Sequence, residues 1–210
     1  MAARKIIIDT DPGQDDAFAI LFALGSPEEL DVIGITTVGG NVPLARTTTN
    51  ALKVLELAQR PDIPVYAGCP GPTLRKLITA ENIHGETGLD GADLPDPTTA
   101  AQSEHAVNYL VRAIMAAPEG ELTVCTLGPM TNLAMAMTME PRIIPRIREV
   151  VSMGGGFFEG GNATPAAEFN IFVDPHAAHK VYASGVPITM AGIDCTYTAQ
   201  MTPGWINSLR

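Results

Sequence analysis

The feature that most constrains this chain is a cluster of four carboxylates within eight residues. They stand in the stretch Asp9-Thr10-Asp11-Pro12-Gly13-Gln14-Asp15-Asp16. An apolar run at 6–8 precedes the stretch and an apolar helical pattern at 17–22 follows it. This order predicts a buried strand, a tight turn and the first turn of a helix.

Carboxylates this close repel one another unless a positive charge lies among them. The N-terminus of a helix supplies only about half a unit charge. The cluster therefore predicts a hard cation with oxygen ligands, Ca²⁺ or Mg²⁺. Asp15 and Asp16 alone would fit the ordinary first turn of a helix, but that interpretation leaves Asp9 and Asp11 unexplained.

Short apolar runs alternate with helical patterns along the whole chain. We expect strands at 5–9, 31–38, 65–67, 122–127, 149–153 and 188–193, and helices near 15–24, 44–59, 103–117, 131–139 and 175–184. This alternation predicts an α/β fold with an open, mostly parallel sheet and helices on both faces. We expect one domain over residues 1–210. Asp174 is the expected N-cap of its helix, Gly185 its end, and Thr131 or Asn132 the cap of another helix.

Each expected strand is followed by glycine or by an acidic residue. The residues concerned are Asp11, Gly39-Gly40-Asn41, Gly68, Gly128, Gly154-Gly155-Gly156 and Asp194. Glycines that simply end strands would explain any one of these loops. Ligands of open α/β sheets bind outside the carboxyl ends of the strands, so six such loops at one edge predict a ligand site there.

Composition excludes several classes of partner. The net charge is −10 and no Lys/Arg cluster is present, which argues against nucleic acid and against an anionic membrane. The three cysteines are scattered without a C-x-x-C spacing, as expected of reduced thiols in a cytoplasmic protein. We expect neither a signal peptide nor a membrane span, because the first residues lead directly into a strand and no apolar run is long enough.

The stretch DTDPGQDDA also resembles the N-terminal signature of the nucleoside hydrolases, the calcium-dependent enzymes that cleave the N-glycosidic bond of ribonucleosides. Other segments match the same family: TTVGGN, HGETGLDG, TLGPMTN and GNATPAAEFN. Together they extend the resemblance over essentially the whole chain. It implies a Rossmann-like nucleoside hydrolase fold, bound Ca²⁺, a ribonucleoside as substrate in nucleoside salvage, and a homo-oligomer, either dimer or tetramer.

The resemblance also implies roles for individual residues. Ca²⁺ would bind Asp11, Asp16 and the backbone carbonyl of Leu127, and Asp11 would act as the catalytic general base. The substrate would contact Asp15, Asn41, His84, Met153, Asn162, Glu168, Phe169 and Asn170. Asn162, Glu168 and Asn170 would hold the ribose hydroxyls, with Met153 and Phe169 against the ring.

The chain departs from the family pattern in two places. The family continues well past residue 210, and that C-terminal part carries a His-Asp pair that supplies one further calcium ligand and a proton for the leaving base. By this resemblance the chain is C-terminally incomplete, and we expect it to be a poor and aggregation-prone hydrolase by itself. Tyr197 stands where many members carry histidine.

Two alternatives remain from the sequence. One is a non-catalytic protein that binds nucleoside or calcium, inactivated by the missing C-terminal part. The other is a magnesium-dependent phosphohydrolase that uses the pair Asp9-x-Asp11 as nucleophile and acid, although that pattern normally has Thr or Val at the position of Gly13. The sequence does not decide between purine and pyrimidine bases.

Overall fold

A computed structural model describes residues 2–208. Within these residues the chain forms one six-stranded sheet in which every neighbouring pair is parallel. The strands are β1 (Arg4–Thr10), β2 (Leu30–Thr37), β3 (Val65–Ala67), β4 (Thr123–Thr126), β5 (Glu149–Met153) and β6 (Ile188–Ala191). Their order across the sheet is β3-β2-β1-β4-β5-β6. The predicted open parallel sheet is confirmed.

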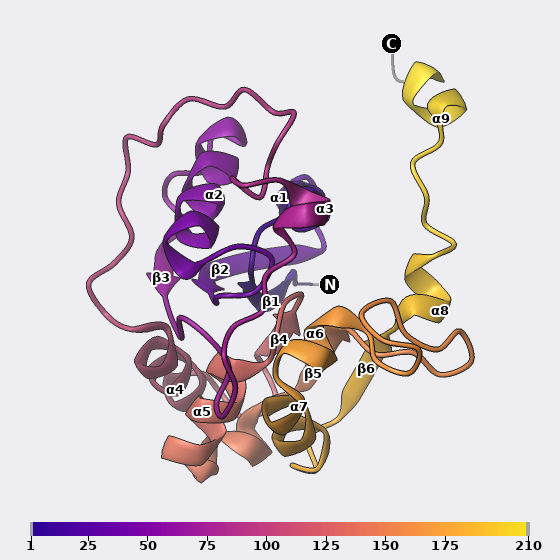
Figure 1. Ribbon diagram of the computed structural model, residues 1–210. Helices are drawn as coiled ribbons and strands as arrows, with labels where there is room; N and C mark the ends of the chain where they lie inside the picture. The colour runs from indigo at the N-terminus through magenta and orange to yellow at the C-terminus, as the bar shows by residue number, and fades with distance from the viewer. Residues whose placement is uncertain (1, 209–210) are drawn as a thin grey trace.

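Helices cover both faces of the sheet, as predicted (Figure 1). The longer ones are α1 (Gln14–Leu24), α2 (Leu44–Leu57), α4 (Ala106–Ala116), α5 (Thr131–Met139) and α7 (Pro175–Tyr182). One apolar core lies between the sheet and α1 and α2, and a second lies between the sheet and α4, α5 and α7. Among the described residues, no helix is both long and apolar enough to cross a membrane.

Strand β1 shows why both faces are covered. Ile6 and Ile8 belong to the core under α1 and α2, whereas Ile7 belongs to the core on the opposite face. Successive side chains of a strand point to opposite faces. An uninterrupted apolar run therefore fits a central parallel strand that is buried on both sides.

Several short elements were not predicted from the sequence. They are α3 (Glu81–His84), the 3₁₀ helix η1 (Pro141–Arg146), α6 (Phe169–Val173) and α8 (Ile193–Thr196). A further short helix, α9 (Pro203–Ser208), lies away from the sheet in Figure 1.

The caps show one confirmed and one wrong prediction. Asp174 caps α7 by accepting a hydrogen bond from the backbone N–H of Ala177, at 3.0 Å, and Gly185 follows the helix with φ of 88°. Neither Thr131 nor Asn132 caps α5, whose N-cap is Met130 without a side-chain hydrogen bond. Both side chains are engaged elsewhere: Thr131 donates to Asp174 and Asn132 donates to Asp9.

The fully buried carboxylate of Asp174 also fastens the segment that follows β3. It accepts hydrogen bonds from the backbone N–H of Thr73, at 2.8 Å, and from the hydroxyls of Thr73 and Thr131, both at 2.9 Å. Arg75 binds the carbonyl oxygen of Phe172 at 2.7 Å and lies over the Phe172 ring. The segment 70–80 is thereby attached to α5, α6 and α7.

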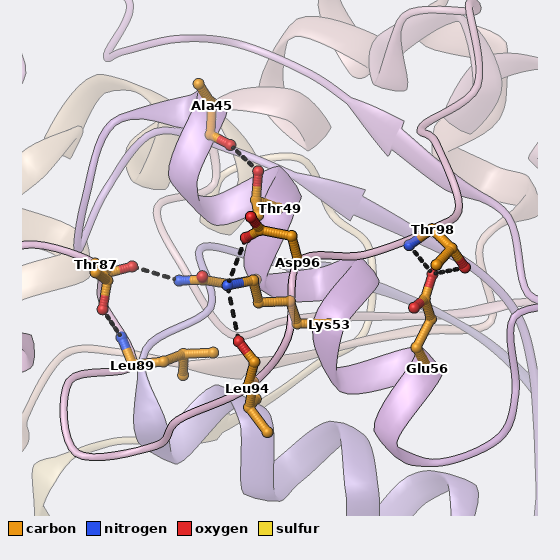
Figure 2. A network of polar contacts seen from close by, with 10 residues as sticks. Ala45, Thr49, Lys53, Glu56, Thr87, Leu89, Leu94, Asp96 and Thr98 are labelled. Atoms are coloured by element: carbon orange, nitrogen blue, oxygen red, sulfur yellow. Dashed lines mark hydrogen bonds and ion pairs between the residues drawn. The ribbon is translucent and has the colours of Figure 1, made fainter.

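The connection from β3 to α4, residues 68–105, is long. Its second half runs along α2 (Figure 2). Lys53 donates to the carbonyl oxygen of Leu94 at 3.3 Å and pairs with Asp96 at 3.2 Å. One turn further on, Glu56 accepts hydrogen bonds from the backbone and hydroxyl of Thr98. The connection is therefore fastened to its surroundings at several points, although the only helix described within it is α3.

Candidate functional site

The strand order creates a crevice between β1 and β4. From β1 the chain proceeds toward β2 and β3, whereas from β4 it proceeds in the opposite direction toward β5 and β6. In open α/β sheets the ligand site lies at this point, outside the carboxyl ends of the strands. The turn that follows β1, residues 11–13, and the turn that follows β4, residues 127–130, meet here.

Asp11 lies at the bottom of this crevice and is fully buried. Its Oδ2 accepts a hydrogen bond from the backbone N–H of Asn41, at 2.6 Å, while its Oδ1 has no hydrogen-bond partner. Glycines lie close to both oxygens, because a Cβ at Gly40 would collide with Oδ2 and a Cβ at Gly128 would collide with Oδ1. Two of the glycines predicted to mark a ligand site thus make room for this carboxylate.

Asp16 lies beside Asp11 at the start of α1 and is also buried. Its carboxylate accepts hydrogen bonds from the Thr10 hydroxyl at 2.6 Å, the Gly13 backbone N–H at 3.0 Å and the Asn41 side-chain amide at 3.3 Å. The neighbouring Asp15 is exposed at the rim. Asn41 therefore bonds to both buried carboxylates.

Burial and mutual repulsion raise the pKa values of these carboxyl groups. Burial raises the pKa of Asp11 well above its usual range, and the charge of Asp16 adds to the effect. Burial and the charge of Asp15 raise the pKa of Asp16 to about 7. Ionising both of these buried carboxylates is costly without a nearby positive charge, which favours a cation here.

The donor set fits a hard cation with mixed ligands. No group of three His, Cys, Asp or Glu side chains able to hold a metal is present in residues 2–208. A cation at this point would need backbone carbonyl and water oxygens beside the two carboxylates, and Ca²⁺ accepts such ligands. Leu127 lines the cavity, and its carbonyl oxygen accepts a hydrogen bond from the Asn170 amide at 2.7 Å.

A cavity of about 450 Å³ opens above these groups. It is lined by all the predicted site residues except Asp11: Asp15, Asp16, Asn41, His84, Leu127, Met153, Asn162, Glu168, Phe169 and Asn170. Asp11 lies behind this lining, bonded to Asn41. The structure thus brings the predicted residues together, although they come from six separate places in the chain, near positions 11–16, 41, 84, 127, 153 and 162–170.

Sequence reasoning missed part of the cavity wall. The additional lining residues are Ile78, Thr79, Ala80, Asn82, Ile83, Ala163 and Phe172. Phe172 stands three residues after Phe169 on α6, a spacing that places two side chains on one side of a helix, so a predicted helix at 169–173 would have indicated it. The residues at 78–83 carry no comparable signal.

The polar wall near α6 is held by its own hydrogen bonds. Glu168 caps α6 by accepting from the backbone N–H of Ile171 at 3.2 Å, and it also accepts from that of Gly155 at 3.0 Å. Burial raises the pKa of Glu168 above its usual value. The Asn162 side chain accepts from the backbone N–H of Phe169 at 2.8 Å. These contacts orient side chains that line the cavity.

One acidic residue that the sequence placed at this edge, Asp194, has another role. Strand β6 ends at Ala191 rather than at 193. Asp194 accepts hydrogen bonds from the backbone N–H groups of Phe157 and Phe158, both at 2.7 Å, which lower its pKa. It therefore fixes the loop after β5 and does not line the cavity. Tyr197 is the C-cap residue that follows α8 (Ile193–Thr196) and is about half exposed.

Asp9 is buried in the sheet, away from the cavity lining. It accepts hydrogen bonds from the Thr36 hydroxyl at 2.6 Å and the Asn132 amide at 2.8 Å, and its Oδ2 has no partner. Burial raises its pKa to about 6. A nucleophile of a phosphohydrolase must reach its substrate, so this placement argues against the pair Asp9-x-Asp11 as catalytic groups of that kind.

Fold and site together define a doubly wound α/β protein with a carboxylate-floored ligand cavity at its switch point. The family of inosine-uridine preferring nucleoside hydrolases matches residues 6–210, and the chain belongs to this family. Members of the family are commonly metal-dependent. The resemblance drawn from the short motifs is thereby confirmed.

Individual relatives agree with this assignment. A protein of Schizosaccharomyces pombe of uncharacterized function is 53% identical over 193 residues, covering 92% of this chain and 62% of its own length. The pyrimidine-specific ribonucleoside hydrolase RihB of Escherichia coli K12 is 50% identical over 203 residues, covering 97% and 64%. The solved purine-preferring ribonucleoside hydrolase of Gardnerella vaginalis superimposes with a TM-score of 0.86 at 36% identity, covering 91% and 61%. The chain thus spans less than two thirds of each of these relatives.

Proposed function

We propose that this chain hydrolyses the N-glycosidic bond of ribonucleosides, giving ribose and a free base, with Ca²⁺ bound in the crevice. The observation that carries the proposal is the unpaired, buried Oδ1 of Asp11 beneath a cavity walled by Glu168 and Asn170. Family membership and relatives named as ribonucleoside hydrolases support it.

Asp11, Asp16 and the Leu127 carbonyl would hold the cation. When bound, Ca²⁺ supplies charge compensation for the carboxylates and lowers the pKa of a water in its coordination sphere. The burial of both carboxylates and the free Oδ1 of Asp11 support this assignment.

Asp11 acts as the general base in this scheme. Its Oδ1 takes a proton from the attacking water while the water oxygen bonds to the anomeric carbon of the ribose. The C–N bond breaks through an oxocarbenium-like state, and its electron pair leaves with the base. The charge of the bound cation would keep Asp11 ionised, which a general base requires.

The remaining lining residues bind and orient the nucleoside. Asp15, Glu168 and Asn170 hold the ribose hydroxyls together with Asn162, because carboxylates accept and amides both donate and accept hydrogen bonds. Met153 and Phe169 lie against the ring. Asn41 and His84 complete the pocket, with His84 at the sugar and base region.

The base preference stays open, because relatives are named both pyrimidine-specific and purine-preferring. The homo-oligomer, the cytoplasmic location and the single domain over 1–210 stay predictions. The role in nucleoside salvage is part of the same proposal.

The test is an assay of free ribose from a panel of nucleosides, with Ca²⁺ or with a chelator, on this chain and on a form extended by a family-like C-terminal part. We expect Ca²⁺-dependent release that is much faster in the extended form. Because a site built to bind a hydroxyl rejects an analogue that lacks it, a ribonucleoside should exceed its 2′-deoxy analogue by about 10⁴.

Glu168→Gln and Asn170→Ala should reduce the rate on ribonucleosides. Glu159→Gln is the matched control, since Glu159 is exposed and lies outside the cavity lining. Equal rates on both sugars would contradict the ribose contacts. Nucleoside binding without any ribose release in either form would favour the non-catalytic alternative.

A further inference from the structure

We propose that Gln14 is a positioning residue that holds His84 as the tautomer with its hydrogen on Nδ1. The ring atom left for a ligand in the cavity is then Nε2, a hydrogen-bond acceptor in the neutral imidazole. The role of Nε2 toward a substrate rests on the proposed function. The position of the imidazole hydrogen on Nδ1 is independent of that proposal.

The orientation of the Gln14 amide follows from its partners. Its Nε2 lies 3.2 Å from the carbonyl oxygen of His84 and 3.3 Å from that of Asp90. Carbonyl oxygens only accept, so the NH₂ group must face them and use its two hydrogens there. The amide oxygen Oε1 then faces Nδ1 of His84, at 2.6 Å. An amide oxygen donates nothing, so the hydrogen of this bond belongs to Nδ1.

Gln14 thus contacts both the backbone and the ring of His84. The turn 84–90 is fixed a second time by Asn50, whose amide donates to the carbonyl oxygens of Pro12, at 2.9 Å, and Thr87, at 2.8 Å. Gln14, at the start of α1, and Asn50, on α2, therefore each hold the turn 84–90 close to the turn after β1.

The ring also packs directly against the turn after β1. A Cβ at Gly13 would lie 2.6 Å from Nδ1 and 2.8 Å from Cε1 of His84. Gly13 therefore makes room for the imidazole, and Gln14, the next residue, supplies its hydrogen-bond acceptor. Gln14 is an uncharged residue within the acidic stretch, and its contact with His84 gives it a function there.

A second histidine offers an internal reference with the opposite tautomer. Nδ1 of His105 accepts a hydrogen bond from the backbone N–H of Val107, at 3.2 Å, as the N-cap of α4. A ring nitrogen that accepts carries no hydrogen, so neutral His105 has its hydrogen on Nε2. His84 and His105 should therefore give contrasting signals in one spectrum.

The experiment is long-range ¹H–¹⁵N correlation NMR of the imidazole rings in the ligand-free full chain, at about pH 8. We expect the hydrogen of His84 on Nδ1 and that of His105 on Nε2. Gln14→Met keeps the side-chain length but removes the acceptor, so His84 should lose its fixed Nδ1–H state. His105 should be unchanged in this variant.

Hydrolysis kinetics provide the second readout. Gln14→Met should lower kcat/KM by about tenfold, the equivalent of one positioning hydrogen bond. Gln102→Met is the matched control, because Gln102 is exposed and outside the cavity lining.

Either a native His84 with its hydrogen on Nε2 or an unchanged His84 signal in Gln14→Met would overturn the inference. The expected spectra without hydrolysis in any form would contradict the proposed function and confirm the Gln14–His84 pair.

Discussion

Without the proposed cation, this protein should show an unusual dependence of stability on pH. Burial raises the pKa of Asp16 to about 7 and that of Asp9 to about 6 in the folded chain, against about 3.9 in an unfolded chain. Between about pH 4 and about pH 7 the folded state then binds more protons than the unfolded state. The free energy of unfolding therefore falls as the pH rises through this window.

The magnitude follows from the two pKa differences. At about 1.4 kcal/mol for each pKa unit, ionised Asp16 lowers the free energy of unfolding by about 4 kcal/mol and ionised Asp9 by about 3 kcal/mol. Both side chains are nearly inaccessible to solvent, so water screens little of this effect. The change is a large share of the roughly 5–15 kcal/mol that stabilises a typical domain.

Ca²⁺ should oppose the loss at neutral pH. A cation that binds only the folded state adds about 2.7 kcal/mol when its concentration is 100 times its Kd. Carboxylates that bind the cation also stay ionised without a penalty, so the slope attributable to Asp16 should disappear. The difference in stability with and without Ca²⁺ should therefore grow from about pH 5 to about pH 7.

Urea unfolding curves between about pH 5 and about pH 8, with Ca²⁺ or with a chelator, measure this directly. Asp16→Asn should reduce the metal-free pH dependence, because the amide does not ionise, and leave the part that Asp9 contributes. Asp62→Asn is the control, since Asp62 is exposed and its pKa is lowered by Arg60. A metal-free stability that is constant, or that rises with pH across this window, would refute the reasoning.

Two further predictions concern contacts within the fold. Gly128→Ala places a Cβ against Oδ1 of Asp11, so we expect calorimetry to show Ca²⁺ binding weakened by about tenfold or more. Gly204→Ala on α9 is the control, and unchanged affinity in Gly128→Ala would contradict the prediction. Asp174→Ala leaves four donors without their buried acceptor and should lower the free energy of unfolding by about 3–5 kcal/mol. A loss below about 1 kcal/mol in chemical denaturation would show that these donors find other partners.

The sheet and its long helices could be predicted from the sequence because each has a strong local signal. The six expected strands and five expected helices are all present, since apolar runs and helical periodicity reflect burial on the faces of one sheet. Short elements such as α3, with four residues, and α6, with five, hold little more than one turn. A single turn has no periodicity to detect.

The side-chain partners could be predicted only where they were local. Asp174 caps the helix that begins at the next residue, so sequence spacing was sufficient. Asn132 stands at an equally suitable position but donates to Asp9, 123 residues away in the chain. Its competing partner exists only after β1 and α5 have packed together. The same limit applies to the cavity-lining residues at 78–83. They lie beside the cavity only once the connection between β3 and α4 has folded.

The four carboxylates that open the chain's acidic stretch show how backbone geometry divides one motif among several roles. Asp9 is still within β1 and is buried, and its Oδ1 accepts hydrogen bonds from Thr36 and Asn132. Asp15 and Asp16 are consecutive on a helix, about 100° apart, so one is exposed and the other buried. Only Asp11 and Asp16 are both buried and beside the crevice. Two negative charges, rather than four, then require compensation there, which is the charge that one divalent cation supplies.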